Sequence, residues 1–382
     1  MSLSRRKTLA LIGGGTILAA SGAAALAVTR GPQTALLPWQ TAGSYVDPRM
    51  RALSYAILAP NPHNRQPWRV DLRRAGEVTL FVDTDRLLPH TDPFNRQIVI
   101  GLGCFLELMV MAAAQDGYGV ELELFPDGSD ATALDERRVA VARFVQGAAS
   151  PDPLFAHVMA RRSLKEPYDI TRPVDPATLN TVLASAQRTQ VAGSVDPDDI
   201  AAFRMISHDA LRIEIETHRT YKESVDLFRI GSREVDANPD GIDFTGPMFE
   251  AMALTGMFSR DAALDRNSMA YTEGLNAVFE NTDTAMGHLW QVTPGNTRAD
   301  QIAAGRDWLR LNLATTAAGL GMQPLSQGLQ EYPEMSDIYA QLHGRLAPAG
   351  GTVQMFARIG YGPEVGQSPR WPLDAKIVNA ET

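Results

Sequence analysis

Two segments of this chain share one pattern, a long helix closed by glycine, at a constant spacing of 202 residues. The first segment spans residues 103–119 and the second spans residues 305–321. The coinciding glycines are Gly103, Gly117 and Gly119 in the first, and Gly305, Gly319 and Gly321 in the second. Glycine at a helix end adopts the left-handed conformation that terminates the helix. A period this long excludes a solenoid and indicates a duplicated domain; the alternative is two unrelated amphipathic helices with glycine caps.

Helices and short strands are expected on both sides of these blocks. Apolar residues at helical spacing predict helices over residues 48–58, 98–114 and 201–228. Alternating patterns predict strands, and these strands span 68–72, 78–82, 120–125, 138–144 and 353–359. The first two strands flank Ala75-Gly76 and are expected to form a hairpin. The pattern predicts an α+β fold.

Chain length sets the expected number of domains. At roughly 150 residues per domain, 382 residues correspond to two domains or one double unit. We expect an N-terminal segment over 1–30, a linker over 31–46, a first half over 47–150 and a second half over 151–375. Residues 231–300 are rich in glycine, proline, asparagine and methionine, which predicts an irregular, adaptable lid over a flat apolar ligand. The alternative for the methionines is gap-filling in the core.

The N-terminus has the pattern of an export signal. Ser4-Arg5-Arg6-Lys7 precedes an apolar run over residues 9–28, and Ala25-Leu26-Ala27 fits a cleavage site. The paired arginines resemble a twin-arginine signal, whose transporter moves folded, cofactor-loaded proteins. This predicts a periplasmic or extracytoplasmic protein handled by twin-arginine export machinery. The alternative is an uncleaved anchor, because 20 apolar residues can span a bilayer, and we expect contact with a membrane only through this segment.

Charge and composition exclude several classes of protein. The formal net charge is −9 and no long basic run occurs, so nucleic-acid binding is not expected. The single cysteine, Cys104, excludes an intrachain disulfide and a thiolate cluster. The seven histidines form no close ligand pair. No metal site is expected.

Polar residues gather in four places that point to binding chemistry. These are the turn 60–68 (Pro-Asn-Pro-His-Asn-Arg-Gln-Pro-Trp), the segment Arg161-Arg162-Ser163-Leu164-Lys165, the segment 324–328 (Pro-Leu-Ser-Gln-Gly), and Arg370 in the tail. An arginine, a hydroxyl and an ammonium within one turn suit a phosphate, although a solvated basic patch is the alternative. The asparagine and glutamine amides suit a ring with alternating donors and acceptors, although a rigid turn is the alternative.

Taken together, these segments resemble the nitroreductase family of FMN flavoproteins, and more closely its Acg-like branch of duplicated, often exported members. The matching motifs are Asn64-x-Gln66-Pro67-Trp68, Arg161-x-Ser163-x-Lys165 and the glycine-capped helix of 305–321. Asn61 stands where the family has serine. The resemblance covers about residues 47–375 and implies a nitroreductase-like mixed sheet flanked by helices.

The two motifs are divided between the halves of the chain. The first half has the Asn-x-Gln-Pro-Trp turn without Arg-x-Ser, and the second half has the reverse. In ordinary family members the flavin lies at a homodimer interface and two sites result. The resemblance therefore implies a monomeric pseudo-dimer whose two halves build one FMN site.

The resemblance also implies roles for individual residues. Arg161, Ser163 and Arg370 would hold the FMN phosphate, and Lys165 would support negative charge on the reduced ring. The full set of implied cofactor-binding residues is Pro60, Asn61, His63, Asn64, Gln66, Arg161, Arg162, Ser163, Lys165, Pro324, Leu325, Ser326, Gln327, Gly328 and Arg370. Trp68 is expected in the core because it opens a strand.

The implied function is that of an FMN oxidoreductase. NAD(P)H would reduce the flavin, and a nitroaromatic, quinone or similar small molecule would accept the electrons. No side chain is required as an acid, base or nucleophile. The alternative is a protein that binds or stores FMN with little turnover. A scaffold with a vestigial fold is a third interpretation, and the retained phosphate-binding residue types argue against it.

Overall fold

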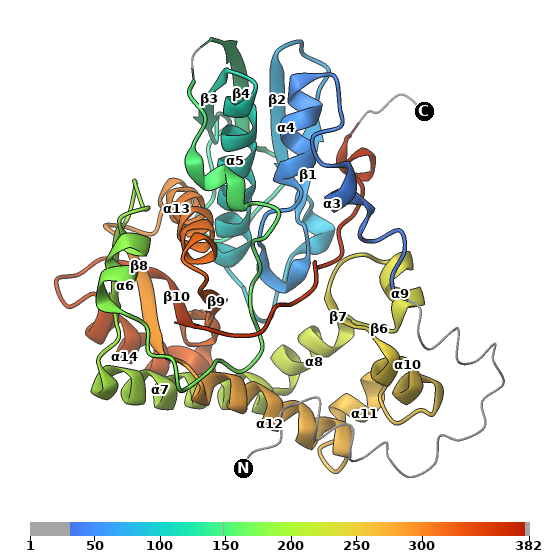
Figure 1. The fold of residues 1–382 in the computed structure, drawn as a ribbon, viewed down its shortest axis with the longest axis vertical. Coiled ribbons are helices and arrows are strands. Elements are labelled where there is room, and N and C mark those ends of the chain that lie inside the picture. Colours follow the sequence, from blue (N-terminus) through green and yellow to red (C-terminus); the bar gives the residue numbers. More distant parts are fainter. Residues whose placement is uncertain (1–30, 148, 379–382) are drawn as a thin grey trace.

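Two four-stranded antiparallel sheets form the framework of the molecule (Figure 1). The computed structural model describes residues 31–147 and 149–378, so the expected export signal over 1–30 lies outside the described residues. The first sheet contains β1 (Trp68–Asp71), β2 (Glu77–Val82), β3 (Tyr118–Leu124) and β4 (Arg138–Gln146). The second contains β5 (Gln190–Ser194), β8 (Gly287–Thr293), β9 (Gly321–Pro324) and β10 (Thr352–Gly360). A parallel pair, β6 (Phe228–Ile230) and β7 (Ile242–Phe244), stands apart.

Both large sheets have the same strand order. The first runs β1-β2-β4-β3 and the second β5-β8-β10-β9. A 20-residue helix precedes the last two strands of each, α5 (Arg96–Gln115) in the first and α13 (Arg298–Ala317) in the second. Gly117 and Gly319 follow these helices with φ of +77° and +70°, the predicted left-handed caps. The expected α+β class, the hairpin of β1 and β2, and the helix within 98–114 are confirmed.

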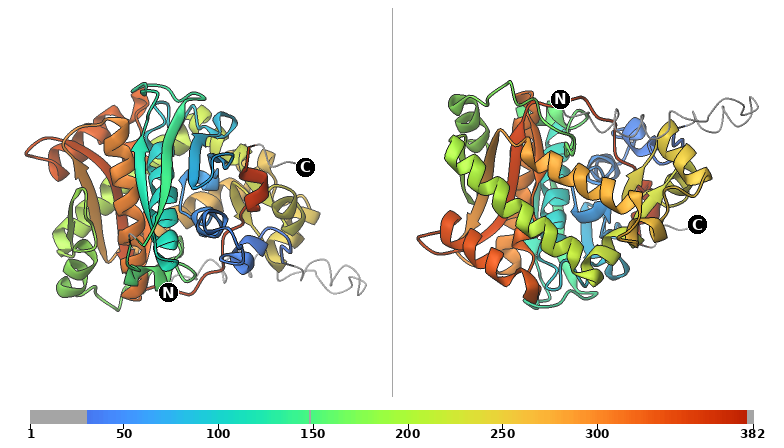
Figure 2. Two further views of the ribbon diagram at one scale, coloured as in Figure 1. Left: turned by 90° about the horizontal axis from the view of Figure 1, so that it is seen from above. Right: turned by 90° about the horizontal axis from the view of Figure 1, so that it is seen from below.

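Helices α5 and α13 pack side by side at the centre of the molecule (Figures 1 and 2). A methyl group added to Gly103 would lie 2.9 Å from the Cα of Gly305, and one added to Gly305 would lie 2.8 Å from the Cα of Gly103. The same additions would overlap the carbonyl oxygens of Ile302 and Ile100, respectively. These contacts are reciprocal between positions 202 residues apart, as at an isologous two-fold interface.

The remaining helices cover the sheets and fill the space between them. Several begin with aspartate before proline, and in α4, α6 and α7 the aspartate side chain caps the first turn. The α-helices are α3 (Leu37–Thr41), α4 (Pro48–Ala56), α6 (Pro176–Leu183), α7 (Pro197–Glu216), α8 (His218–Asp226), α9 (Ser232–Ala237), α10 (Pro247–Leu254), α11 (Arg260–Leu264), α12 (Met269–Asp283) and α14 (Ser336–Leu346). The 3₁₀ turns are η1 (Pro62–Asn64), η2 (Thr84–Arg86), η3 (Pro153–His157), η4 (Gln327–Leu329), η5 (Pro333–Met335) and η6 (Leu373–Lys376).

The single helix expected over 201–228 is wrong, because the chain bends between α7 and α8. Thr217 has extended backbone angles of −76° and 101°. The Thr220 hydroxyl donates to the carbonyls of Glu214 and Thr217, at 2.6 and 2.8 Å, and thereby satisfies groups left open by the bend. The apolar periodicity of the sequence continues across the bend, so the pattern alone does not indicate two helices.

The irregular chain expected over 231–300 is also wrong. Nearly half of this range forms α9 to α12, and residues 287–293 form β8, an internal strand of the second sheet. The side chains of Ser259 and Ser268 cap the first turns of α11 and α12. These caps stabilise helix starts in a segment whose glycine, proline and asparagine content disfavours helices. Any lid in this range would therefore be built from α9 to α12 rather than from irregular chain.

The expected linker over 31–46 is packed rather than free. Its short helix α3 carries Trp39, which is 2% exposed. The indole Nε1 of Trp39 donates to the carbonyl of Ser368 at 2.8 Å, so the tail after β10 lies against α3. This tail crosses from the second sheet to the first (Figure 1), where Ile377 forms an isolated parallel bridge with Val70 of β1.

One helix among the described residues, α5, is long and apolar enough to cross a membrane. Its most apolar window is 89% buried inside the protein, as is usual for a core helix. Trp68 is fully buried and its ring lies 5.0 Å from that of Phe105 in α5, which confirms the core position expected for this tryptophan.

Candidate functional site

A strained turn brings the predicted amide residues to the centre of the molecule. His63, Asn64 and Gln66 all have positive φ, between 48° and 51°. Such angles cost free energy in non-glycine residues and persist only where the surroundings hold them. The Asn61 side chain closes the turn by accepting a hydrogen bond from the backbone N–H of Gln66 at 2.7 Å. The turn lies against Gly101 of α5, where an added Cβ would be 3.1 Å from the Asn61 Cβ.

Arg161 and Arg370 meet at the main chain just before this turn. Both donate to the carbonyl of Leu58, Arg161 from Nη2 at 3.0 Å and Arg370 from Nη2 at 3.1 Å. Arg370 also donates from Nη1 to the Oδ1 of Asn64 at 2.6 Å. Arg161 donates from Nη1 to the Oδ1 of Asn312 at 2.9 Å. The structure thus brings together the amide turn of the first half and the arginines of the second.

These two guanidinium groups are buried without a carboxylate. Arg161 is 3% exposed and Arg370 is 2% exposed. Neither forms a salt bridge within residues 31–147 and 149–378, and the Nε of Arg370 is buried with no hydrogen-bond partner there. Burial lowers the pKa of Arg161 to about 10; burial and the charge of Arg161 lower that of Arg370 to about 9. Two like charges and a spare donor are features that would suit a bound anion, and Arg161 and Arg370 are therefore the candidate anion site.

From the α3 side, Trp39 packs against Arg370 and against Arg162, the neighbour of Arg161 in the sequence. Its ring centroid lies 5.1 Å from the guanidinium carbon of Arg162 and 5.7 Å from that of Arg370. Arg162 is half-buried and donates to main-chain carbonyls of Met159 and Arg161. A tryptophan in a supposed linker was the only sequence sign of this contact. Trp39 and Asn312 are residues of the site that sequence reasoning missed.

A second group of titratable residues lies beside the turn. The half-buried His63 contacts the Ser224 hydroxyl through Nε2 at 2.9 Å, and burial together with Lys165 and Arg65 lowers its pKa to about 4. Asp243 is exposed, yet the surrounding protein raises its pKa, while the charges of Lys165 and Arg370 oppose that rise. The charge of Lys165 acts on both His63 and Asp243. Lys165 therefore belongs to the same region as His63.

The segment 324–328 approaches the site from β9. The N–H of Leu164 donates to the carbonyl of Met322 at 3.0 Å, so the segment after Arg161 runs beside this strand. Leu325 and Gly328 are buried, whereas Pro324, Ser326 and Gln327 are half-buried. Pro60 and Ser163 are half-buried as well. No hydrogen bond between described residues joins 324–328 directly to the amide turn.

The side chain of Gln66 is hydrogen-bonded to other parts of the protein. It is fully buried, its Nε2 donates to the carbonyl of Pro239 at 2.7 Å, and its Oε1 accepts from the N–H of Trp371 at 2.8 Å. Its backbone carbonyl accepts from the Nζ of Lys376 at 2.8 Å. Gln66 therefore ties the turn to two other segments of the chain, a different task from the direct cofactor contact implied by the family resemblance.

No family model matches the chain. It is 28% identical over 335 residues to a Mycobacterium tuberculosis protein with the provisional name NAD(P)H nitroreductase Acg, covering 85% of this chain and 93% of that relative. A second M. tuberculosis protein, also provisionally named a NAD(P)H nitroreductase, is 24% identical over 336 residues, covering 84% and 90%. The chain is similar to these named nitroreductases along most of its length.

Solved nitroreductases also align with the model. The FMN-dependent nitroreductase NfnB of Mycobacterium smegmatis, solved with NADPH, is 19% identical and covers 56% of this chain and 92% of its own, with a TM-score of 0.33. The FMN-bound nitroreductase of Bacteroides fragilis is 12% identical and covers 60% and 97%, with a TM-score of 0.34. Scores in this range do not by themselves establish a common fold. Among the described residues, no three His, Cys, Asp or Glu side chains are grouped to hold a metal ion.

Proposed function

We propose that this protein is an FMN-dependent oxidoreductase of the nitroreductase type. It would take hydride from NAD(P)H and pass electrons to a nitroaromatic, quinone or similar small acceptor. The observation that carries the proposal is the buried pair of Arg161 and Arg370, which has no carboxylate and one spare Nε donor. A phosphate group carries the charge and the acceptor oxygens that such a pair requires.

The residues present fit FMN in chemistry as well as in charge. Arg161 and Arg370 would hold the phosphate, and Asn61 and Asn64 would lie beside it. Lys165 would supply positive charge near the ring, and the low pKa of His63 keeps that histidine neutral, so it adds no competing charge. When bound, FMN supplies the hydride and electron chemistry. The provisional names of the M. tuberculosis relatives support NAD(P)H as the reductant.

We also propose that the molecule is a monomeric pseudo-dimer with one FMN between its halves, over the ranges 47–150 and 151–375. The equal strand orders and the reciprocal crossing of α5 and α13 support this proposal. So does the arrangement of the anion site, because Leu58 and Asn64 come from the first half and Arg161 and Arg370 from the second.

Export by a twin-arginine-type route, with a membrane anchor as the alternative, is a further proposal that rests on residues 1–30 alone. Sequencing the N-terminus of the protein recovered from its native host tests it. A mature chain beginning near residue 28 would support export with cleavage, whereas an intact N-terminus in the membrane fraction would support anchoring.

The decisive experiment is to identify the ligand that co-purifies with the chain and then to test its turnover. We expect FMN by mass, loss of absorbance near ~450 nm on addition of NAD(P)H, and its return with a nitroaromatic or quinone. Bound FMN that NAD(P)H does not reduce would support a storage function instead. A chain that neither retains nor binds added FMN would contradict both.

A further inference from the structure

A short segment between α9 and β7 is docked on the strained turn. The carbonyl of Pro239 accepts from the Nε2 of Gln66 at 2.7 Å, and the N–H of Gly241 donates to the carbonyl of Asn64 at 3.3 Å. Gly241 has φ of +76°, and an added Cβ would overlap the carbonyl of Leu227, so the segment is held in one conformation. Residues 239–241 thus contact residues 64–66 along their whole length.

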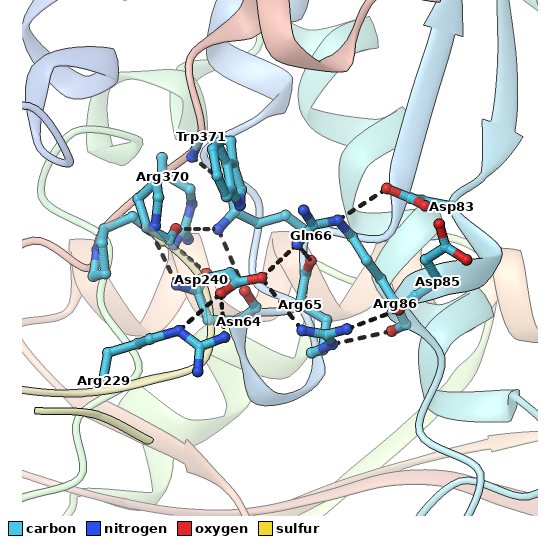
Figure 3. A network of polar contacts seen from close by, with 12 residues as sticks. Asn64, Arg65, Gln66, Asp83, Asp85, Arg86, Arg229, Asp240, Arg370 and Trp371 are labelled. Atoms are coloured by element: carbon cyan, nitrogen blue, oxygen red, sulfur yellow. Dashed lines mark hydrogen bonds and ion pairs between the residues drawn. The ribbon is translucent and has the colours of Figure 1, made fainter. Parts of the chain in front are cut away.

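Asp240, in the middle of this segment, is the centre of an ion cluster (Figure 3). Its side chain is 5% exposed. One carboxylate oxygen accepts from Arg229 at 2.7 Å, and the other pairs with Arg65 at 3.3 Å and with Arg86. Arg86 also pairs with Asp83 at 2.9 Å. Asp240 therefore joins β6, the strained turn and the end of β2 through a single carboxylate.

The cluster carries more positive than negative charge. Three arginines surround Asp240. Lys376 is also near, because the charges of Arg86 and Arg65 lower its pKa and those of Asp83 and Asp240 raise it. Arginines crowded in this way repel one another unless a carboxylate stands between them. Without the charge of Asp240, the arginines of the turn and of β6 have no common partner, and the contact between 239–241 and 64–66 should open.

The opposite side of the turn carries the anion site. Asn64 accepts from Arg370 at 2.6 Å and donates to the carbonyl of Pro369 at 3.0 Å. His63, Asn64 and Gln66 hold positive φ only because contacts on both sides enforce it. A turn released on the side of Asp240 would therefore relax and move Asn64 away from Arg370.

We propose that Asp240 is a positioning residue that keeps the Asn61–Gln66 turn, and through it Arg370, in the geometry that retains FMN. The inference rests on the proposed function for its ligand, whereas the contact of 239–241 with the turn is independent of it. Asp240 itself touches arginines rather than the anion site, so its effect is transmitted through Arg65 and Asn64.

The test compares Asp240→Asn with a matched control, Asp236→Asn, in the FMN-loaded full chain. Asp236 is an acid of the neighbouring helix α9, and it accepts hydrogen bonds from the N–H groups of Gln33, Thr34 and Ala35 instead of from the turn. We expect FMN to dissociate about tenfold faster from Asp240→Asn than from wild type, with little change in Asp236→Asn. Flavin fluorescence on dilution measures both rates. Equal rates in the two variants would overturn the proposal.

A milder variant and a second measurement keep the test valid if Asp240→Asn does not fold. Arg229→Gln removes one partner of Asp240 and leaves Arg65 and Arg86 in place, so we expect an intermediate rate. Hydrogen exchange of residues 62–66 in the FMN-free protein should quicken in Asp240→Asn and Arg229→Gln and stay unchanged in Asp236→Asn. Unchanged exchange would overturn the positioning role. Faster exchange in a protein that never binds FMN would support the contact and contradict the proposed function.

Discussion

At the scale of single residues, Arg161 and Arg370 differ from buried acids whose charge the chain neutralises. Glu107 is 2% exposed and pairs with Arg306 at 2.7 Å and with Arg310 at 3.1 Å. Asp307, fully buried, accepts from three consecutive backbone N–H groups over 187–189 and pairs with Arg188. Arg298 and Arg358 are also buried, and they too form no salt bridge among the described residues. What sets Arg161 and Arg370 apart is that both guanidinium groups donate to one carbonyl, and two like charges placed this close together would favour a bound anion.

Removing the Arg161 side chain tests this interpretation directly. Arg161→Ala should weaken FMN binding by about 1.5–3 kcal/mol, the scale of a charge-assisted hydrogen bond. Arg143→Ala is the control, because Arg143 is half-exposed on the first sheet and pairs only with Glu77 and Glu123. Flavin content after dialysis measures the difference. Equal retention in the two variants would contradict the phosphate assignment.

Lys376 predicts a dependence of stability on pH. Its side chain is buried against the carbonyl of Gln66, and burial lowers its pKa from 10.5 to about 7. Between these values the unfolded chain binds a proton that the folded chain does not, so this lysine makes the free energy of unfolding rise with pH. From pH 7 to pH 10 the rise should be about 2–4 kcal/mol larger in wild type than in Lys376→Met. Urea denaturation of the FMN-free proteins at both pH values measures it, and parallel behaviour would disprove the assignment.

At the scale of elements, the crossing of α5 and α13 decides how the two sheets are placed. Glycine is required at 103 and 305 because each helix backbone lies against the other there, with no room for Cβ. Cys104, fully buried, fits the same contact by donating from Sγ to the carbonyl of Gly305 at 3.1 Å. Gly117 and Gly319, at the ends of these helices, instead adopt the left-handed backbone conformation that leads into the next strand.

Replacing a glycine by alanine at the crossing of α5 and α13 should lower the free energy of unfolding, whereas the same replacement in an open part of α12 should not. Gly103→Ala places a methyl group against backbone atoms that cannot rotate away, so we expect a loss of about 2–3 kcal/mol of unfolding free energy. Gly274→Ala in α12 meets nothing within 4 Å and should stabilise by about 0.5–1 kcal/mol. Denaturant midpoints of both variants provide the comparison. A Gly103→Ala protein as stable as wild type would mean that the helices can separate without cost.

At the scale of the whole molecule, the two halves are interleaved rather than merely joined. The tail after β10 carries Arg370 to the anion site and Lys376 to the turn, and it ends beside β1. The segment containing Arg161 likewise reaches Leu58 of the first half. Neither half contains both the amide turn and the two arginines, so under the proposed function we expect separated halves not to bind FMN.

This arrangement predicts the stoichiometry of the cofactor. We expect a monomer that binds one FMN, because the complementary residues of the site occur once in the chain. Native mass spectrometry of the loaded protein should give the mass of one chain with a single FMN. Two FMN per chain, or FMN bound only in dimers, would contradict the pseudo-dimer.

The sequence by itself determined the elements that depend on local physics. Helix periodicity, the glycine caps at 117 and 319, and the hairpin of β1 and β2 follow from neighbouring residues, so they could be predicted. Arg161, Asn64 and Arg370 could be nominated because their types suit an anion and a polar ring. The bend at Thr217 and the helices within 247–283 escaped, because composition there is ambiguous and capping geometry decided the outcome.

Only the tertiary structure decided which of the nominated residues meet. Arg161 reaches Leu58 across 103 positions and Arg370 reaches Asn64 across 306, and both contacts depend on how α5 and α13 cross and on the path of the tail. Three further contacts depend on the same long-range packing. Gln66 bonds to Pro239, Trp39 packs over Arg370, and Asp240 pairs with Arg229. Residues that act through partners so distant along the chain leave no local pattern, because burial and charge pairing arise only when the chain is folded.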